Sequence, residues 1–398
     1  MSQQLISRNA DLLRLQEDGF EVAIVNDHLT IGNVPYVTSA RNVAHGTLVS
    51  TLTLSGDRTQ RPDTHVAMFI GEKPCDAQGR ELTKIIIGSS DTALGGGLVE
   101  NHTFSSKPSV GYYVDYYEKM STYAALLSNE AAAIDPDVTA RTRRVVANDD
   151  LASPFTYLDT ATTRAGIGEV VQKLIGERIA IVGLGGTGSY VLDQIAKTPV
   201  HRIDLFDDDV FLQHNAFRSP GAASLDELRE RPSKVDHLTQ VYSRMHRRIV
   251  SHPVRLGPGN LSLIADATFV FLCLDAGEAK AAIIEELERL DVSFVDVGMG
   301  LHMVDGAIVG QLRVTTSTPG MREQIRTKGR IPLKGAGLDD IYSRNIQVAD
   351  LNMINAGLAV LRWKRLRGFY VDLEREHFSL FTLDGNHLLN EDRPGEAA

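Results

Sequence analysis

A glycine-rich segment, Gly183-Leu184-Gly185-Gly186-Thr187-Gly188-Ser189, carries the strongest chemical signal in this 398-residue sequence. An apolar run at 178–182 predicts a strand before it, and a helix is predicted after it, to residue 196. Glycines allow a tight turn and close approach of the backbone to phosphate, and the free N–H groups at the helix start face the anion. The segment therefore predicts a nucleotide site at Gly183, Gly185, Gly186, Gly188 and Ser189. A glycine turn without a ligand is the simpler alternative.

Acidic residues follow the next predicted strand, 202–206. Asp207-Asp208-Asp209 comes about 20 residues after the glycines, where a carboxylate can hydrogen-bond the ribose of a nucleotide. An NAD-dependent oxidoreductase and an ATP-dependent enzyme fit this pattern equally well. An acidic loop that binds nothing also remains open.

Polar and basic residues beyond the acidic cluster separate these two classes. Asn215 and Arg218 follow the cluster, Lys234 begins the next predicted helix, and Asp275 ends the third predicted strand. When a carboxylate attacks an α-phosphate and pyrophosphate leaves, arginine and lysine can stabilise the concentrated charge, and an aspartate can hold Mg²⁺. Hydride transfer has no evident need for this cationic pair. Each residue alone could be part of a surface ion pair, but their joint occurrence favours an adenylating site.

In this order the residues resemble the ThiF/MoeB/ubiquitin-activating superfamily. The shared run is a G-x-G-G-x-G-S loop, a D-x-D-x-V strand end, N-x-x-R, a helix lysine and a strand-end aspartate. Residues 294–298 and 310–314 are similar to later strands of that family. The resemblance implies a Rossmann-like, doubly wound α/β adenylation domain with a mostly parallel sheet.

The resemblance also implies a role for each residue. Asp275 is expected to hold Mg²⁺, although the family usually has asparagine where this chain has Ala276. The other expected contacts are with ATP: Asp207 with the ribose, Asp209 and Asn215 with the nucleotide pocket, and Arg218 and Lys234 with the triphosphate. A further implied contact is in trans, because the position of Arg164 matches an arginine that reaches the partner's ATP in related homodimers.

The activity that the resemblance implies is adenylation of the C-terminal glycine of a ubiquitin-like protein, with a conjugating enzyme as a further partner. Adenylation of a small peptide or sulfur carrier remains an alternative. The intact glycine loop, with Arg218, Lys234 and Asp275, argues against a scaffold that has lost ATP binding. Thioester-forming relatives carry a cysteine in the crossover segment, whereas residues 315–345 contain none. Ser343 is therefore a candidate acyl acceptor, and a helix N-terminal residue is its simpler interpretation.

The elements that position these residues fall in the second half of the chain. Strands and helices alternate there, which predicts a parallel sheet with helices on both faces. Residues 1–134 show strands first and a tyrosine-rich helix after, which is an α+β pattern. Residues 104–108 and the helix that follows are similar to segments that precede ThiF domains in bacterial operons for ubiquitin-like conjugation, a resemblance that implies an accessory domain for binding a partner. The polar stretch 135–154 is predicted to be a linker, and 155–398 the adenylation domain.

The composition argues against several other classes of protein. The net charge of −10 argues against broad binding to nucleic acid or to an anionic membrane. Two cysteines, Cys75 and Cys273, exclude a disulfide framework. Neither a signal peptide nor a membrane-length apolar run is recognised, so a cytoplasmic location is expected.

Overall fold

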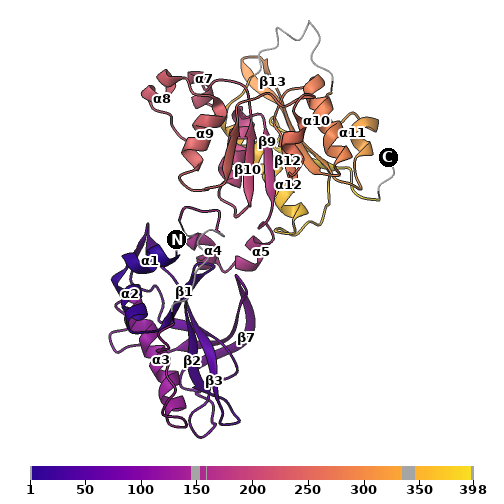
Figure 1. The fold of residues 1–398 in the computed structure, drawn as a ribbon. Helices are drawn as coiled ribbons and strands as arrows, with labels where there is room; N and C mark the ends of the chain where they lie inside the picture. The colour runs from indigo at the N-terminus through magenta and orange to yellow at the C-terminus, as the bar shows by residue number, and fades with distance from the viewer. Residues whose placement is uncertain (1, 145–152, 158, 334–345, 396–398) are drawn as a thin grey trace. The chain divides into compact units, whose positions relative to one another are not determined.

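The computed structural model describes residues 2–144, 153–157, 159–333 and 346–395, without the side chains of residues 2–4, 160, 163 and 164. The chain forms two compact units, Met1–Gln172 and Lys173–Ala398, each with its own hydrophobic core (Figure 1). In the described part of the chain, no helix is long and apolar enough to span a membrane.

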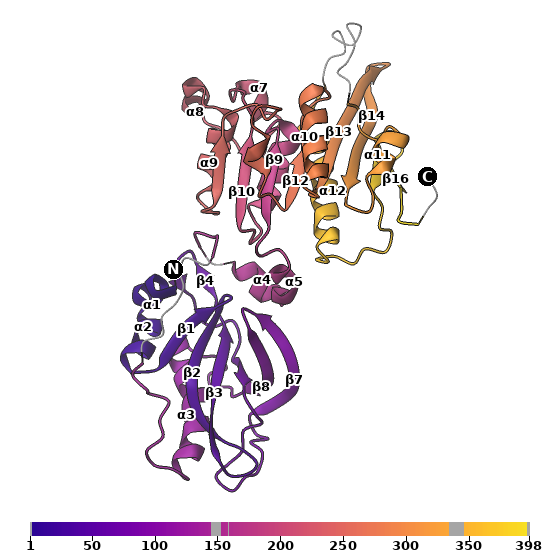
Figure 2. The same ribbon diagram turned by 45° about the vertical axis from the view of Figure 1, so that its right-hand side comes forward.

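The first unit is an antiparallel sheet flanked by helices. Its described strands lie in the order β1-β2-β3-β6-β8-β7 (Figure 2). Their bounds are Glu21–Val25, His28–Val37, Val43–Thr51, Val66–Ile70, Leu98–Ser105 and Ile86–Gly95, in that order. A separate two-stranded ribbon is formed by β4 (Leu54–Ser55) and β5 (Arg58–Thr59). The helices of this unit are α1 (Ser2–Arg8), α2 (Ala10–Glu17), α3 (Tyr116–Ala132), α4 (Thr160–Ala165) and α5 (Gly168–Gln172).

Helix α3 supplies much of this unit's core. It begins after Asp115, whose carboxylate accepts a hydrogen bond from the Glu118 N–H at 2.8 Å. Tyr116 and Tyr123 are fully buried against the sheet, and their hydroxyls bond the Thr53 N–H and the His65 carbonyl. The tyrosines of this helix therefore act mainly in packing.

The second unit has an eight-stranded sheet in its described residues, in the order β11-β10-β9-β12-β13-β14-β15-β16. The first five of these strands are parallel, and the last three pair antiparallel (Figure 2). In sheet order the bounds are Ile249–His252, Arg202–Phe206, Arg178–Val182, Phe269–Leu272, Ser293–Val304, Ala307–Ser317, Phe378–Thr382 and His387–Glu391.

Helices cover both faces of this sheet, because its strands alternate apolar residues between two cores. Ile181, Leu205 and Phe271 pack with α6 (Gly186–Ile195), α9 (Lys234–Tyr242) and α12 (Ala349–Leu366). Val182, Phe206 and Leu272 pack on the other face with α10 (Glu278–Arg289), the 3₁₀ turn η1 (Leu261–Ile264) and α11 (Glu323–Thr327). Two short helices, α7 (Gln213–Ala216) and α8 (Leu225–Glu230), lie between β10 and α9. The predicted doubly wound α/β unit with a mostly parallel sheet, and the α+β first unit, are confirmed.

Candidate nucleotide-binding site

Three parallel strands end level with one another and bring the predicted residues to one edge. Val182 of β9 pairs with Phe206 of β10 on one side and with Leu272 of β12 on the other. After β9 the chain forms β10 on one side of β9, and it later forms β12 on the other side of β9. Such a switch of direction opens a crevice at the carboxyl ends of the strands, where α/β sheets bind ligands.

The glycine loop combines close packing with one open position. A Cβ on Gly188 would lie 1.9 Å from the Gly183 carbonyl oxygen, and one on Gly186 would lie 2.1 Å from the Asn352 side chain. Gly183 has a φ of +90°, and its Cβ would lie 2.5 Å from the Cys273 carbonyl oxygen. Nothing lies within 4 Å of a Cβ on Gly185. Close contacts within the loop, with Cys273 after β12 and with Asn352 of α12 thus explain three glycines, and the fourth faces open space.

Ser189 belongs to the first turn of α6. It is fully buried, and its hydroxyl donates a hydrogen bond to the Gly186 carbonyl at 2.7 Å. This bond satisfies one backbone acceptor near the helix start, so Ser189 stabilises the loop from behind.

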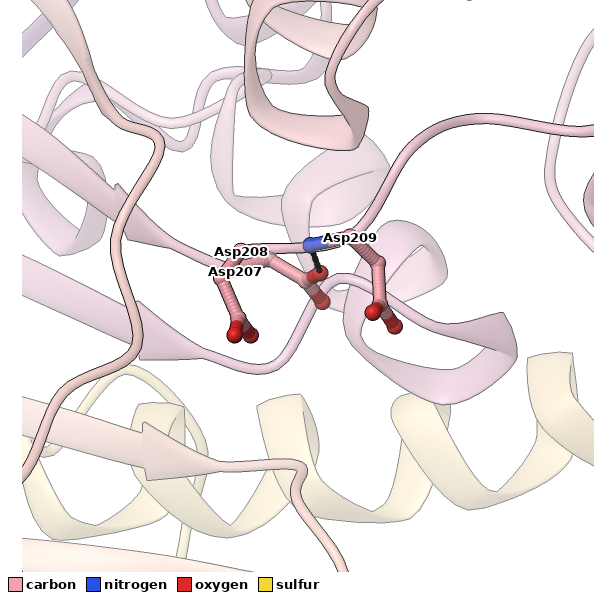
Figure 3. A group of neighbouring side chains, drawn as sticks. All are labelled: Asp207, Asp208 and Asp209. Carbon is pink, nitrogen blue, oxygen red and sulfur yellow. Dashed lines mark hydrogen bonds between the residues drawn. The ribbon is translucent and has the colours of Figure 1, made fainter.

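Asp207 is fixed by two backbone donors. One carboxylate oxygen accepts from the Leu184 N–H at 2.7 Å, and the other accepts from the Asp209 N–H at 2.9 Å (Figure 3). The first bond ties the end of β10 to the glycine loop. A carboxylate has about four lone-pair positions, so Asp207 keeps acceptor capacity for a ligand hydroxyl.

Lys234 supplies the positive charge opposite these carboxylates. Its ammonium lies 2.6 Å from the Asp209 carboxylate and 3.3 Å from that of Asp207. The hydrogen bond and charge of Lys234, with the charges of Arg255 and Arg218, hold the pKa of Asp209 below its usual value. Three cations thus surround one acidic turn, which creates a field suited to an anionic ligand.

The carboxylate oxygens of Asp207, Asp208 and Asp209 lie within 4.8 Å of one another (Figure 3). Lys234 is ion-paired with two of these carboxylates, Asp207 and Asp209, and both Asp207 oxygens accept hydrogen bonds from backbone N–H groups. We therefore interpret the cluster as part of an ion-paired turn rather than as a metal site.

A cavity of about 340 Å³ lies at this edge. That volume falls in the range of small-molecule sites. The buried Nε of Arg218 has no hydrogen-bond partner among the described residues, as is also true of Arg202, Arg322, Arg362 and Arg367, so Arg218 is distinguished by its place in the cavity lining. Of the residues predicted from the sequence, the cavity lining includes Gly183, Gly185, Asp207, Asp209, Arg218, Lys234 and Asp275.

Four other predicted residues that the structure describes do not line this cavity. Asn215 is buried, and its side-chain oxygen accepts from the Leu212 N–H at 2.9 Å, which stabilises the turn that carries Arg218. Gly186, Gly188 and Ser189 support the loop from behind, as described above. Arg164 is in α4, but its side chain is outside the described part, and Ser343 lies in the segment 334–345 that is not described.

A second, larger cavity of about 660 Å³ adjoins the first. The two share Leu274, Asp275, Ala276 and Lys280 as lining residues. The rest of the second wall comes mainly from β13, β14 and β15, and includes Gly298, Gly300, Gly310, Gln311, His302, Arg313, Leu380 and Asp384. Backbone exposed by glycines can approach an extended chain closely.

A buried ion triad connects the walls of the second cavity. Asp296 is fully buried, and its oxygens lie 2.6 Å from the Lys280 ammonium and 2.6 Å from the Arg313 guanidinium. Arg313 also donates to Thr315 and to the Arg330 carbonyl. Two cations share one carboxylate, so the triad carries a net positive charge beside the point where the cavities meet.

Protein-family models match two parts of this chain. A family model described as "ThiF family" matches residues 160–321, and one described as "Domain of unknown function (DUF6791)" matches residues 10–160. Residues 160–321 form a ThiF-family domain. The predicted membership in the ThiF/MoeB superfamily, with an extra N-terminal domain, is confirmed.

Known relatives share part of the chain. "Ubiquitin-like modifier-activating enzyme 5" of Xenopus laevis is 26% identical over 168 residues, which are 39% of this chain and 42% of that protein. The chain therefore spans less than half the length of this relative. Two solved structures have a similar fold. The structure of PaaA has a TM-score of 0.44 and 17% identity, and the match covers 56% of this chain and 75% of PaaA. The structure of E. coli MccB with ATP has a TM-score of 0.44 and 16% identity, and the match covers 58% of this chain and 70% of MccB.

Several lining residues were not predicted from the sequence. Arg255 follows β11, which was not recognised as a strand, so the spacing gave no signal. Lys280 stands in a charged helix and belongs to no recognised motif, but it is almost fully buried. Gln347 also lines the smaller cavity, from the residues that lead into α12.

Neither cysteine has the surroundings of a reactive thiol. Burial raises the pKa of the Cys273 thiol, which follows β12 next to the glycine loop. Cys75 is buried in the first unit, where burial again raises the thiol pKa. A nucleophilic cysteine needs a lowered thiol pKa and access to its substrate, and the thiol pKa of both residues is raised instead.

Proposed function

We propose that this protein is an ATP-dependent adenylating enzyme that activates the C-terminal glycine of a ubiquitin-like protein. The observation that carries the proposal is the single cavity in which the glycine loop, Asp207, Arg218, Lys234 and Asp275 meet. The ThiF family match supports the same chemistry, as does the relative whose name describes activation of a ubiquitin-like modifier.

In this proposal the nucleotide occupies the smaller cavity. Its phosphates lie toward Arg218, Lys234 and the start of α6, and its ribose lies toward Asp207. The unpaired Nε of Arg218 fits an anionic ligand, and Lys234 exchanges its bond with Asp209 for the phosphate. Asp275 is exposed in the lining and is the residue placed to hold Mg²⁺, which would neutralise charge on the phosphates.

The acyl substrate occupies the larger cavity, because Asp275 and Lys280 stand where the two cavities meet. The substrate carboxylate then attacks the α-phosphorus, the bond to pyrophosphate breaks, and acyl-AMP remains. The net positive triad of Lys280, Asp296 and Arg313 favours a carboxylate at this junction. The glycine-rich wall suits a narrow, extended chain terminus.

Transfer of the acyl group is proposed to proceed without a thioester on this chain. The segment 315–345 has no cysteine, and burial raises the pKa of both thiols. A conjugating enzyme would then take the acyl group directly, or Ser343 would receive it. We further propose a homodimer in which Arg164 of one protomer reaches the ATP of its partner.

The test is exchange of labelled pyrophosphate into ATP, with peptides that differ only in their C-terminal residue as acyl substrates. Exchange is expected with peptides ending in glycine and not with those ending in asparagine or glutamate. Preference for the latter would point to a small-peptide substrate, and binding of NAD without exchange would point to an oxidoreductase.

The same assay tests the metal assignment. Asp275→Ala should lower exchange by at least about 100-fold, because a group that stabilises transition-state charge is lost. Asp266→Ala is the control, since this exposed residue lies at the opposite end of the parallel strands, beside Arg178. Equal pyrophosphate exchange by the two variants would show that Asp275 is not part of the site.

A further inference from the structure

The first unit contains a paired serine and histidine that the proposed adenylation does not use. Ser89 of β7 and His102 of β8 face each other across the two strands, and the Ser89 hydroxyl lies 2.8 Å from His102 Nδ1. Ser89 is exposed, whereas His102 is only 7% exposed. An exposed hydroxyl against a buried imidazole is the arrangement of a nucleophile and its base.

The surroundings of His102 favour its neutral form. In the neutral tautomer protonated at Nε2, Nδ1 accepts the Ser89 hydroxyl proton. Burial, followed by the charge of Lys73, lowers the pKa of His102, so the ring is neutral at neutral pH.

The pair opens onto a cavity. A volume of about 570 Å³ is lined by Gly71, Glu72, Ser89, Ser90, Asp91, Asn101 and His102. Next to Ser89, the strand pairing is irregular: Ser90 and Asp91 together oppose Asn101 alone. Such bulges redirect side chains and are frequent beside active sites.

The polar wall of this cavity is internally connected. Asn101 accepts from the Gly71 N–H and donates to Asp91, both at 2.9 Å. The two carboxylates, Glu72 and Asp91, make the cavity acidic. An acyl donor that enters it is therefore neutral or cationic.

We propose that Ser89 and His102 form an acyl-transfer site for neutral or cationic esters and thioesters. The Ser89 oxygen attacks the carbonyl carbon, and its proton passes to His102 Nδ1. The bond to the alcohol or thiol breaks, and the leaving group takes that proton. Water then attacks the acyl-serine in the same way and releases a carboxylic acid. This inference is independent of the proposed adenylation.

The test uses the full chain and a neutral fluorophosphonate probe, which labels serines activated by a histidine. Labelling is expected at Ser89 by mass spectrometry, absent in Ser89→Ala, and reduced by at least about 100-fold in His102→Gln. Ser105→Ala is the matched control, because Ser105 also contacts a histidine, His65, at 3.0 Å but does not line the cavity.

Circular dichroism of each variant shows whether the fold is kept, and exposed Ser89 can be replaced without disturbing the core. No labelling of the wild-type protein, or labelling that persists in Ser89→Ala, would overturn the proposal. Equal labelling of Ser105 and Ser89 would also overturn the proposal, since the cavity would then have no effect on the reactivity of the serine.

Discussion

Gly188 and Gly185 stand in the same loop but differ in what surrounds them. A Cβ on Gly188 would meet the Gly183 carbonyl at 1.9 Å, and a backbone carbonyl cannot move aside as a flexible side chain can. Overpacking of this kind costs about 1–3 kcal/mol. Gly185 has open space and an ordinary φ of −69°.

Gly188→Ala should therefore lower the melting temperature of the nucleotide-free protein, whereas Gly185→Ala should leave it unchanged or slightly higher. Thermal denaturation monitored by circular dichroism measures both. Equal melting temperatures would mean that the loop relaxes freely and that the close contact at Gly188 has no energetic consequence.

The order of residue types along the chain predicted Asp207, Arg218, Lys234 and Asp275 as site residues, and all four line one cavity. Asp207 and Asp275 follow strands, Arg218 follows the acidic cluster, and Lys234 begins a helix. Asn352 could not be recognised, because it reaches Gly186 from a helix far along the chain. Contacts between segments distant in sequence leave no local pattern.

At the scale of elements, Asp296 joins three of them. It lies in β13 and pairs with Lys280 of α10 and Arg313 of β14. Removing one member of a buried ion pair typically costs about 3–5 kcal/mol, because the remaining charges are left buried and unpaired.

Asp296→Ala should therefore lower the free energy of unfolding by about that amount. Asp226→Ala, which breaks an exposed pair with Arg229, should change it by less than about 1 kcal/mol. Urea denaturation of the two variants gives the comparison. A similar, small loss in both would show that water or rearrangement compensates the triad.

The sequence predicted the interior strands better than the edge strands. The bounds of β9 and β10 agree with the prediction because both are short, largely apolar segments buried on two faces. The edge strands β11 and β16 were missed, since Ile249–His252 and His387–Glu391 mix polar and apolar residues. Their strand conformation comes from pairing with a neighbour rather than from local pattern.

For the molecule as a whole, two buried histidines of the second unit link stability to pH. Burial lowers the pKa of His246 and of His377 to about 4. Their unfolded pKa is near 6.5, so below that value the unfolded chain binds protons that the folded chain does not. Stability should then fall as pH decreases from 6.5 to 4, by roughly 3 kcal/mol for each histidine.

Urea denaturation across this pH range measures the slope, and His377→Gln should make it shallower. Glutamine does not titrate here and can still reach Thr318, which His377 Nε2 contacts at 3.1 Å. A slope that is unchanged in the variant would show that His377 is not the group that takes up the proton.

The central claim, that a substrate carboxylate is joined to AMP, is tested most directly by oxygen transfer. A glycine-ended peptide carrying ¹⁸O in both carboxylate oxygens is turned over with ATP, and the nucleotide products are analysed by mass spectrometry. If the carboxylate attacks the α-phosphorus, AMP acquires one labelled oxygen and pyrophosphate acquires none. Label in inorganic phosphate together with formation of ADP would mean attack at the γ-phosphorus, and would contradict the account.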